Sequence, residues 1–320
     1  MTDAPRTPLG SSDIAVFPIN LGGNVFGWTS DEEESFAVLD AYAAAGGNFL
    51  DTADVYSAWK PGNAGGESER IIGRWMASRG NRDDMVVATK VGMLEGLEGT
   101  SRDIVRRAVD ASLERLGTDR IDLYYAHRDF TDRPVEEAVE ALAEQVTLGK
   151  VRTIGASNFG AQRLEQALRF SESENIARYV AIQNKYSLVE RSAVEGGDDA
   201  RTVGEVALAE NVAVLPYSSL ASGFLTGKYR EGVAVDSPRS GAASKYLTEE
   251  GRALLAELDR IAAAHEVEVS TVSLAWLLAR PTVSAPIASA RTVDQLPALI
   301  AAASLELSDE EVESLTAVVA

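Results

Sequence analysis

The feature that most constrains the fold of this chain is an alternation of short β-rich runs with longer stretches of helical spacing. The helical stretches place apolar residues three and four positions apart, as in SRDIVRRAVDASLERLG at 101–117. Gly46, Gly80 and Gly117 stand where such helices should end. Eight runs have the strand pattern, and they lie at 16–20, 48–52, 85–90, 121–127, 151–157, 179–184, 212–217 and 283–289.

Eight strand–helix units in 320 residues predict an α/β fold, a (β/α)8 or TIM barrel, as one domain over residues 1–320. The alternative is a doubly wound open sheet, but no glycine-rich fingerprint joins the first strand to its helix. Two segments exceed a minimal barrel. One is an amphipathic helix at 248–265, before the seventh barrel helix at 270–280. The other is a C-terminal helix capped by Ser308, with Glu311 at the capping-box position.

Charge and cysteine content narrow the classes of function. A net charge of −19 argues against nucleic acid and anionic membranes as partners. The absence of cysteine excludes disulfides, thiolate metal ligands and cysteine nucleophiles. The N-terminus has no basic segment followed by an apolar one, so we read no signal peptide and expect a cytoplasmic protein. The sequence leaves the oligomeric state open between a monomer and a homo-oligomer.

Polar residues gather at the predicted strand ends. In a TIM barrel the active site is built at the carboxyl ends of the strands, from the loops that follow them. Three such loops are long, at 57–67, 187–199 and 228–247, and loops of this length are usually functional or mobile. The polar residues at the strand ends are Asp51 with nearby Tyr56, Lys90, His127, Ser157–Asn158, Gln183–Asn184 and Tyr217–Ser218.

Lys90, Asp51 and Tyr56 form a chemically consistent set. Lys90 ends an apolar run, so its stem is buried and its ammonium needs a partner, which Asp51 on the neighbouring strand can supply. A phenol titrates near 10, and a neighbouring ammonium should lower that pKa and make Tyr56 a better proton donor. The alternatives are a structural ion pair and an aromatic residue that merely lines the barrel mouth.

His127 is one of two histidines, and it closes a predicted strand. There a neutral imidazole could donate a hydrogen bond to a carbonyl oxygen, or it could be a purely structural histidine. With a single histidine at the mouth, we expect no histidine-based metal site.

The ordered set of motifs resembles the aldo-keto reductase superfamily over essentially the whole chain. The matching segments are GGNFLDTADVY (46–56), VVATK (86–90), DLYYAHR (122–128), IGASNF (154–159), IQNKYSL (182–188) and LPYSSLASGFLTGKY (215–229). The resemblance implies a TIM barrel that binds NADPH in extended form and reduces a small aldehyde or ketone. It also implies that Tyr56 is the general acid, that Lys90 and Asp51 adjust the pKa of Tyr56, and that His127 orients the substrate carbonyl.

The resemblance also assigns the cofactor contacts. Ser157, Asn158 and Gln183 would hold the carboxamide, Tyr217 would stack on the nicotinamide, and residues 218–228 would follow the pyrophosphate. The complete set of cofactor residues is Gly23, Asn24, Asp51, Ser157, Asn158, Gln183, Tyr217, Ser218, Leu220, Gly223, Leu225, Lys228, Ser289, Arg291 and Gln295.

Arg291 matches a position where relatives place a cation against the adenosine 2′-phosphate, which favours NADPH, with NADH possible but weaker. The alternative is that Arg291 has no cofactor contact and only caps a loop. One position departs from the pattern. Many relatives have Asn four residues after the residue that contacts adenine, which is Gln295 here, but this chain has Leu299. We therefore expect fewer hydrogen bonds to adenine.

Trp28, Trp59, Tyr56 and His127 are the expected substrate contacts, although both tryptophans could equally be packing residues. Two other functions stay open. The chain could be a regulatory subunit that binds NADPH with little turnover, or an aldolase that forms a Schiff base through Lys90.

Overall fold

The computed structural model describes residues 5–197 and 200–319. Eight parallel strands form one sheet in the order β10-β3-β4-β5-β6-β7-β8-β9. Their bounds are β3 Asn20–Gly22, β4 Phe49–Asp51, β5 Val86–Val91, β6 Ile121–Ala126, β7 Val151–Ser157, β8 Tyr179–Gln183, β9 Ala213–Val214 and β10 Ile287–Ala288.

The two ends of this sheet meet and close it. Val214 pairs in parallel with Val283, and its amide donates to the carbonyl of Thr282 at 2.8 Å. Further along, the amide of Ile287 donates to the carbonyl of Pro216 at 2.8 Å. The predicted (β/α)8 barrel is therefore confirmed, and the open-sheet alternative is excluded.

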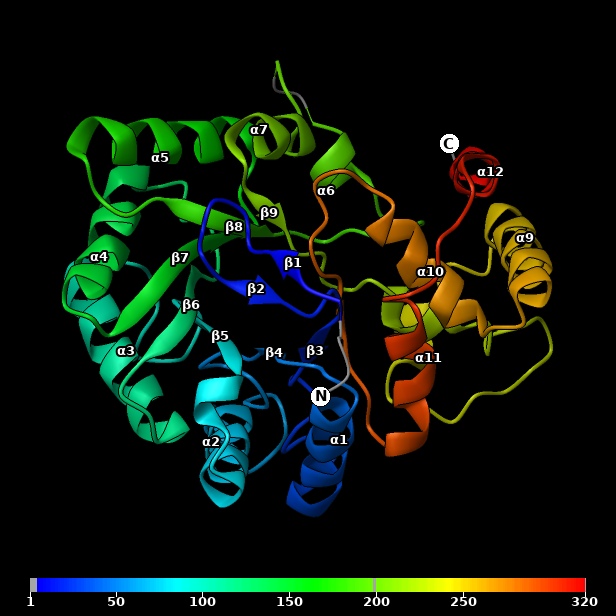
Figure 1. Cartoon of the computed structure of the whole chain (residues 1–320), viewed down its shortest axis with the longest axis horizontal. Helices are drawn as coiled ribbons and strands as arrows, with labels where there is room; N and C mark the ends of the chain where they lie inside the picture. Colours follow the sequence, from blue (N-terminus) through cyan, green and yellow to red (C-terminus); the bar gives the residue numbers. More distant parts are fainter. Residues whose placement is uncertain (1–4, 198–199, 320) are drawn as a thin grey trace.

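A ring of helices surrounds the strands (Figure 1). The amphipathic spacing read from the sequence places an apolar face of each helix against the sheet. Gly80 and Gly117 end α2 and α3 in the left-handed conformation, with φ of 64° and 61°. The helices of the ring are α1 Glu32–Ala44, α2 Glu67–Arg79, α3 Arg102–Leu116, α4 Val135–Thr147, α5 Ala161–Glu174, α7 Val203–Glu210, α10 Val269–Leu278 and α11 Leu296–Ala301.

Both predicted extra helices are present, and α9 and α12 lie outside the ring beside α10 (Figure 1). The helix α9 (Glu249–His265) is capped by the Thr248 hydroxyl, and α12 (Asp309–Val318) has the expected capping box of Ser308 and Glu311. His265 Nε2 lies 2.8 Å from Glu311 Oε1 and ties α12 to α9. Shorter helices occur within or beside the loops: α6 Ser192–Glu195, α8 Ser240–Ser244, η1 Arg82–Asp84, η2 Ala221–Thr226 and η3 Val293–Gln295.

The first predicted strand, at 16–20, is wrong in its bounds. The barrel strand β3 begins at Asn20, while β2 (Ala15–Val16) pairs antiparallel with β1 (Thr7–Pro8). Pro18 lacks an amide donor, so one continuous ladder through 16–20 is disfavoured. The β1–β2 hairpin lies across the centre of the barrel (Figure 1) and packs its apolar side chains on those inside the barrel.

Among the described residues, no single helix is long and apolar enough to cross a membrane. Only α9 and α10 taken together reach that length and composition, and they are bent by 94° relative to each other.

Candidate active site

Lys90 lies at the carboxyl end of β5 with its side chain completely buried. Its Nζ is 2.8 Å from both carboxylate oxygens of Asp51, 2.7 Å from the carbonyl oxygen of Thr52 and 2.9 Å from Oη of Tyr56. The strands β4 and β5 are paired in parallel register, which brings Asp51 and Lys90 to the same end of the barrel. A buried ammonium is thus held between a carboxylate and a phenol.

The phenol of Tyr56 donates to Asp51 Oδ2 at 3.0 Å. Burial, followed by the charge of Asp51, raises the pKa of Tyr56 well above its ordinary value of 10. We expected Lys90 to lower the pKa of Tyr56. In this structure that effect is outweighed, because the phenol is desolvated and faces a carboxylate as well as the ammonium. Tyr56 is consequently protonated at neutral pH, the state that a proton donor requires.

His127 follows β6 and stands beside Tyr56, with a distance of 6.2 Å between ring centroids. Burial, followed by the charge of Lys90, lowers the pKa of His127 from 6.5 to about 3. Its Nδ1 is buried and has no hydrogen-bond partner among the described residues. The ring is therefore a neutral imidazole that can donate one hydrogen bond without bringing a charge.

Three polar residues at the ends of β7 and β8 are linked by hydrogen bonds, and one of them, Gln183, reaches Asp51. Gln183 Nε2 donates to Asp51 Oδ1 at 2.8 Å, and Ser157 Oγ donates to the Gln183 carbonyl at 2.8 Å. Asn158 donates to the His127 carbonyl at 3.1 Å and accepts from Tyr217 Oη at 2.8 Å. Asp51 is therefore the shared acceptor of Lys90, Tyr56 and Gln183.

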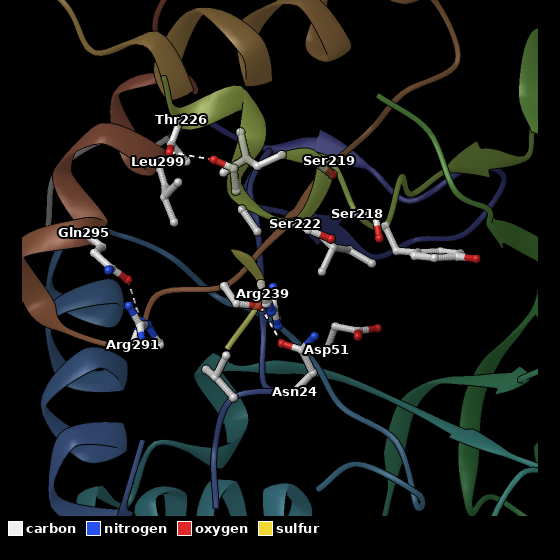
Figure 2. A pocket seen from close by; sticks show the side chains of 18 of the residues that line it. Asn24, Asp51, Ser218, Ser219, Ser222, Thr226, Arg239, Arg291, Gln295 and Leu299 are labelled. Carbon is white, nitrogen blue, oxygen red and sulfur yellow. Dashed lines mark hydrogen bonds between the residues drawn. The ribbon is translucent and has the colours of Figure 1, made fainter. Parts of the chain in front are cut away.

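An elongated pocket of about 840 Å³ opens above this group. It runs from Tyr56 and His127 to Arg291 and Gln295, and Figure 2 shows the latter pair on the opposite side from Ser218. Most residues named from the sequence line it: Asn24, Trp28, Asp51, Tyr56, His127, Ser157, Asn158, Gln183, Tyr217, Ser218, Leu220, Gly223, Lys228, Ser289, Arg291 and Gln295.

Sequence comparison agrees with this geometry. The model of the Aldo/keto reductase family matches residues 18–320. The chain belongs to the aldo/keto reductase family. It is 31% identical to Protein tas of Escherichia coli, with 96% of this chain and 95% of that protein covered. It is 36% identical to the uncharacterized oxidoreductase YrpG of Bacillus subtilis, with 95% and 92% covered. It is 33% identical to the norsolorinic acid reductase stcV of Emericella nidulans, with 93% and 77% covered.

Three residues named from the sequence for cofactor or substrate contact in this aldo/keto reductase lie outside the pocket lining. A Cβ at Gly23 would be 2.6 Å from Ser68 Oγ, so this glycine permits close packing against α2, and Gly22 lines the pocket instead. Leu225 is completely buried in the core. Trp59 is 48% exposed and packs edge-on against Trp28 and Tyr56, at the rim of the pocket.

The structure also brings Arg239 and Met93 into the pocket lining, which the sequence reasoning missed. Arg239 comes from the long loop 228–247, and its guanidinium lies 5.7 Å from the Trp28 ring. Burial, followed by repulsion from Arg291, lowers the pKa of Arg239. The length of this loop was the only signal in the sequence, since loop composition does not say which side chain turns inward.

Three cations in the pocket lining have no carboxylate within ion-pair distance among the described residues: Lys228, Arg239 and Arg291. Glu268 and Asp294 also line the pocket, but neither forms an ion pair with them. Unpaired cations are notable in a chain with a net charge of −19. The pocket of this aldo/keto reductase is therefore suited to an anionic ligand.

Proposed function

We propose that the protein reduces aldehydes or ketones to alcohols with NADPH, and that Tyr56 donates the proton. The observation that carries this proposal is the set of contacts of 2.8–3.0 Å among Tyr56, Lys90 and Asp51 at the base of the elongated pocket. The chain's membership of the aldo/keto reductase family supports carbonyl reduction in general. A relative named as a norsolorinic acid reductase agrees with that reaction class.

Three cations in the pocket lining support a phosphorylated dinucleotide as the ligand. Lys228, Arg239 and Arg291 can balance its phosphates, because none of them is neutralised by a described carboxylate. Tyr217 offers an aromatic ring beside Asn158, where a nicotinamide can stack. Bound NADPH would supply the hydride.

The chain's own residues would handle the oxygen of the substrate. His127 as a neutral imidazole can donate a hydrogen bond to the carbonyl oxygen, and Tyr56 can deliver its proton to that oxygen. Lys90 then stabilises the phenolate that Tyr56 becomes. Donors fixed before the reaction stabilise the negative charge that develops on the oxygen.

The direct test of this proposal uses the purified protein with NADPH and 4-nitrobenzaldehyde. We expect loss of NADPH absorbance together with one equivalent of 4-nitrobenzyl alcohol. Tight NADPH binding without turnover across a panel of aldehydes and ketones would contradict the proposal and support a regulatory subunit. The aldolase alternative has less support, since Lys90 Nζ is buried and already contacts four oxygen atoms.

We expect Arg291→Ala to weaken NADPH binding by about 10- to 100-fold, the effect of losing a hydrogen bond between charged groups. NADH binding should change little, because NADH lacks the 2′-phosphate. Fluorescence titration with both cofactors measures the difference. Arg260→Ala is the matched control, since Arg260 is exposed on α9 and paired with Glu257. An equal loss for NADPH and NADH in Arg291→Ala would contradict the assignment.

A further inference from the structure

The long loop 57–67 begins with a strained residue directly after Tyr56. Ser57 has a φ of 70°, in the left-handed region that residues other than glycine rarely adopt, and it is completely buried. It does not line the pocket. Strained backbone of this kind persists only where the surrounding contacts fix it, and it concentrates at functional sites. The contacts that fix Ser57 therefore bear on the placement of Tyr56.

The hydroxyl of Ser57 makes the first of these contacts. Its Oγ donates to the carbonyl oxygen of Phe26 at 2.7 Å. Phe26 lies in the loop after β3, and its side chain is completely buried in the hydrophobic core. The amide of Phe26 donates to the carbonyl of Gly23 at 3.0 Å, which holds the backbone at this point. Ser57 is thus bonded to a fixed part of the neighbouring strand–loop unit.

Asn63, further along the same loop, holds the turn through the carbonyl of Ser57. Its Nδ2 donates to that carbonyl at 2.9 Å and to the carbonyl of Gly27 at 3.1 Å. The amide of Lys60 also donates to the Ser57 carbonyl, at 3.1 Å. Ser57 and Asn63 therefore each bond one carbonyl of the loop after β3, and we call this pair of residues the loop clamp.

The loop clamp holds the segment that carries two groups of the site. Tyr56 precedes Ser57, and its Oη lies 2.9 Å from Lys90 Nζ. Trp59 follows Ser57 and packs edge-on against Tyr56 and against Trp28 of the loop after β3. A displacement of about 1 Å at a reacting group can lower a rate by about 100-fold. Release of the turn would act first on Tyr56, because one peptide bond joins it to Ser57.

We propose that Ser57 is a positioning residue for the proposed reduction: its hydroxyl bond to the Phe26 carbonyl holds the left-handed turn that orients the backbone of Tyr56. Asn63 supports the same turn through the Ser57 carbonyl. Neither Ser57 nor Asn63 lines the pocket, so the loop clamp acts on the reaction through Tyr56.

The test replaces Ser57 with glycine, which adopts the left-handed conformation freely but has no hydroxyl. The inference rests on the proposed function, so kcat is measured with 4-nitrobenzaldehyde at saturating NADPH. We expect Ser57→Gly to lower kcat by about 10- to 100-fold, with the Kd of NADPH unchanged. Wild-type kcat in Ser57→Gly would show that the backbone conformation alone is sufficient, and it would overturn the role of the hydroxyl.

A double variant separates positioning of Tyr56 from a general effect on the fold. In the Tyr56→Phe background the phenol hydroxyl that Ser57 positions is already gone. Adding Ser57→Gly should therefore change the residual kcat by less than about twofold, because residues that act as a unit are not additive. A loss as large as that seen with Tyr56 present would show that Ser57 acts independently of Tyr56, and it would overturn the inference.

Thermal unfolding tests the strained turn without reference to activity. Ser57→Ala loses the same hydroxyl as Ser57→Gly but keeps a Cβ in the left-handed region, so its Tm should be the lower of the two. An equal or higher Tm for Ser57→Ala would contradict the strain at Ser57, and with it the loop clamp.

Ser171→Ala is the matched control, because Ser171 is a buried serine on α5 whose Oγ donates to the carbonyl of Ala167 at 3.0 Å. Ser171 does not line the pocket, and its variant should keep the kcat of the wild type. An equal loss of kcat in Ser171→Ala would show that any buried hydroxyl bond has this effect, and it would overturn the inference about Ser57 alone. An inactive wild type overturns the proposed function, and with it the role of Ser57 in the reaction.

Discussion

Lys90→Met should cost the protein both its activity and a large part of its stability. The substitution leaves the Asp51 carboxylate completely buried without the cation that now lies 2.8 Å away. Breaking a buried ion pair in this way costs about 3 to 5 kcal/mol, because the remaining charge is uncompensated. Methionine fills a similar volume, so the effect measures the loss of charge more than the loss of packing.

The free energy of unfolding in urea measures this effect. Lys150→Met is the matched control, because Lys150 forms a surface ion pair with Asp110 at 2.5 Å. That pair should contribute less than about 1 kcal/mol. Equal stability of the two variants would contradict the account of Lys90. In the activity assay, Lys90→Met should lose most of kcat because the phenolate of Tyr56 would no longer be stabilised.

The sequence predicted the barrel because its eight strand–helix units repeat a local pattern, and each unit carries its own evidence. It predicted α9 from its amphipathic spacing and α12 from the cap of Ser308 with Glu311. It missed the β1–β2 hairpin, since strands of two residues are too short to show a period. The placement of that hairpin depends on contacts with residues far away in the chain.

The sequence predicted those site residues whose positions are determined by the ends of the strands. Asp51, Lys90 and His127 end or follow strands, and parallel register brings them together. Arg239 was missed because its place depends on how the loop 228–247 folds. The direction of the pKa shift of Tyr56 was also mispredicted, because the sequence shows the neighbouring ammonium but not the extent of burial.

Tyr56→Phe should remove most of the catalytic rate while leaving the fold and the cofactor pocket intact. The ring contacts with Trp59 and His127 remain, and Lys90 keeps its bonds to Asp51 and Thr52. Only the proton and the oxygen that carries it are lost. General acids of this kind contribute about 10²- to 10⁴-fold to the rate.

Tyr179→Phe is the matched control for this substitution. Tyr179 is a buried tyrosine of β8 that packs on Phe159, and its hydroxyl has no hydrogen-bond partner among the described residues. Tyr179 does not line the pocket, so its variant should keep the activity of the wild type.

The most direct test of the central claim is kcat of Tyr56→Phe for 4-nitrobenzaldehyde at saturating NADPH, measured beside the wild type. We predict a fall of about 100-fold or more, with the Kd of NADPH unchanged. Full kcat in Tyr56→Phe would contradict the claim that Tyr56 is the proton donor.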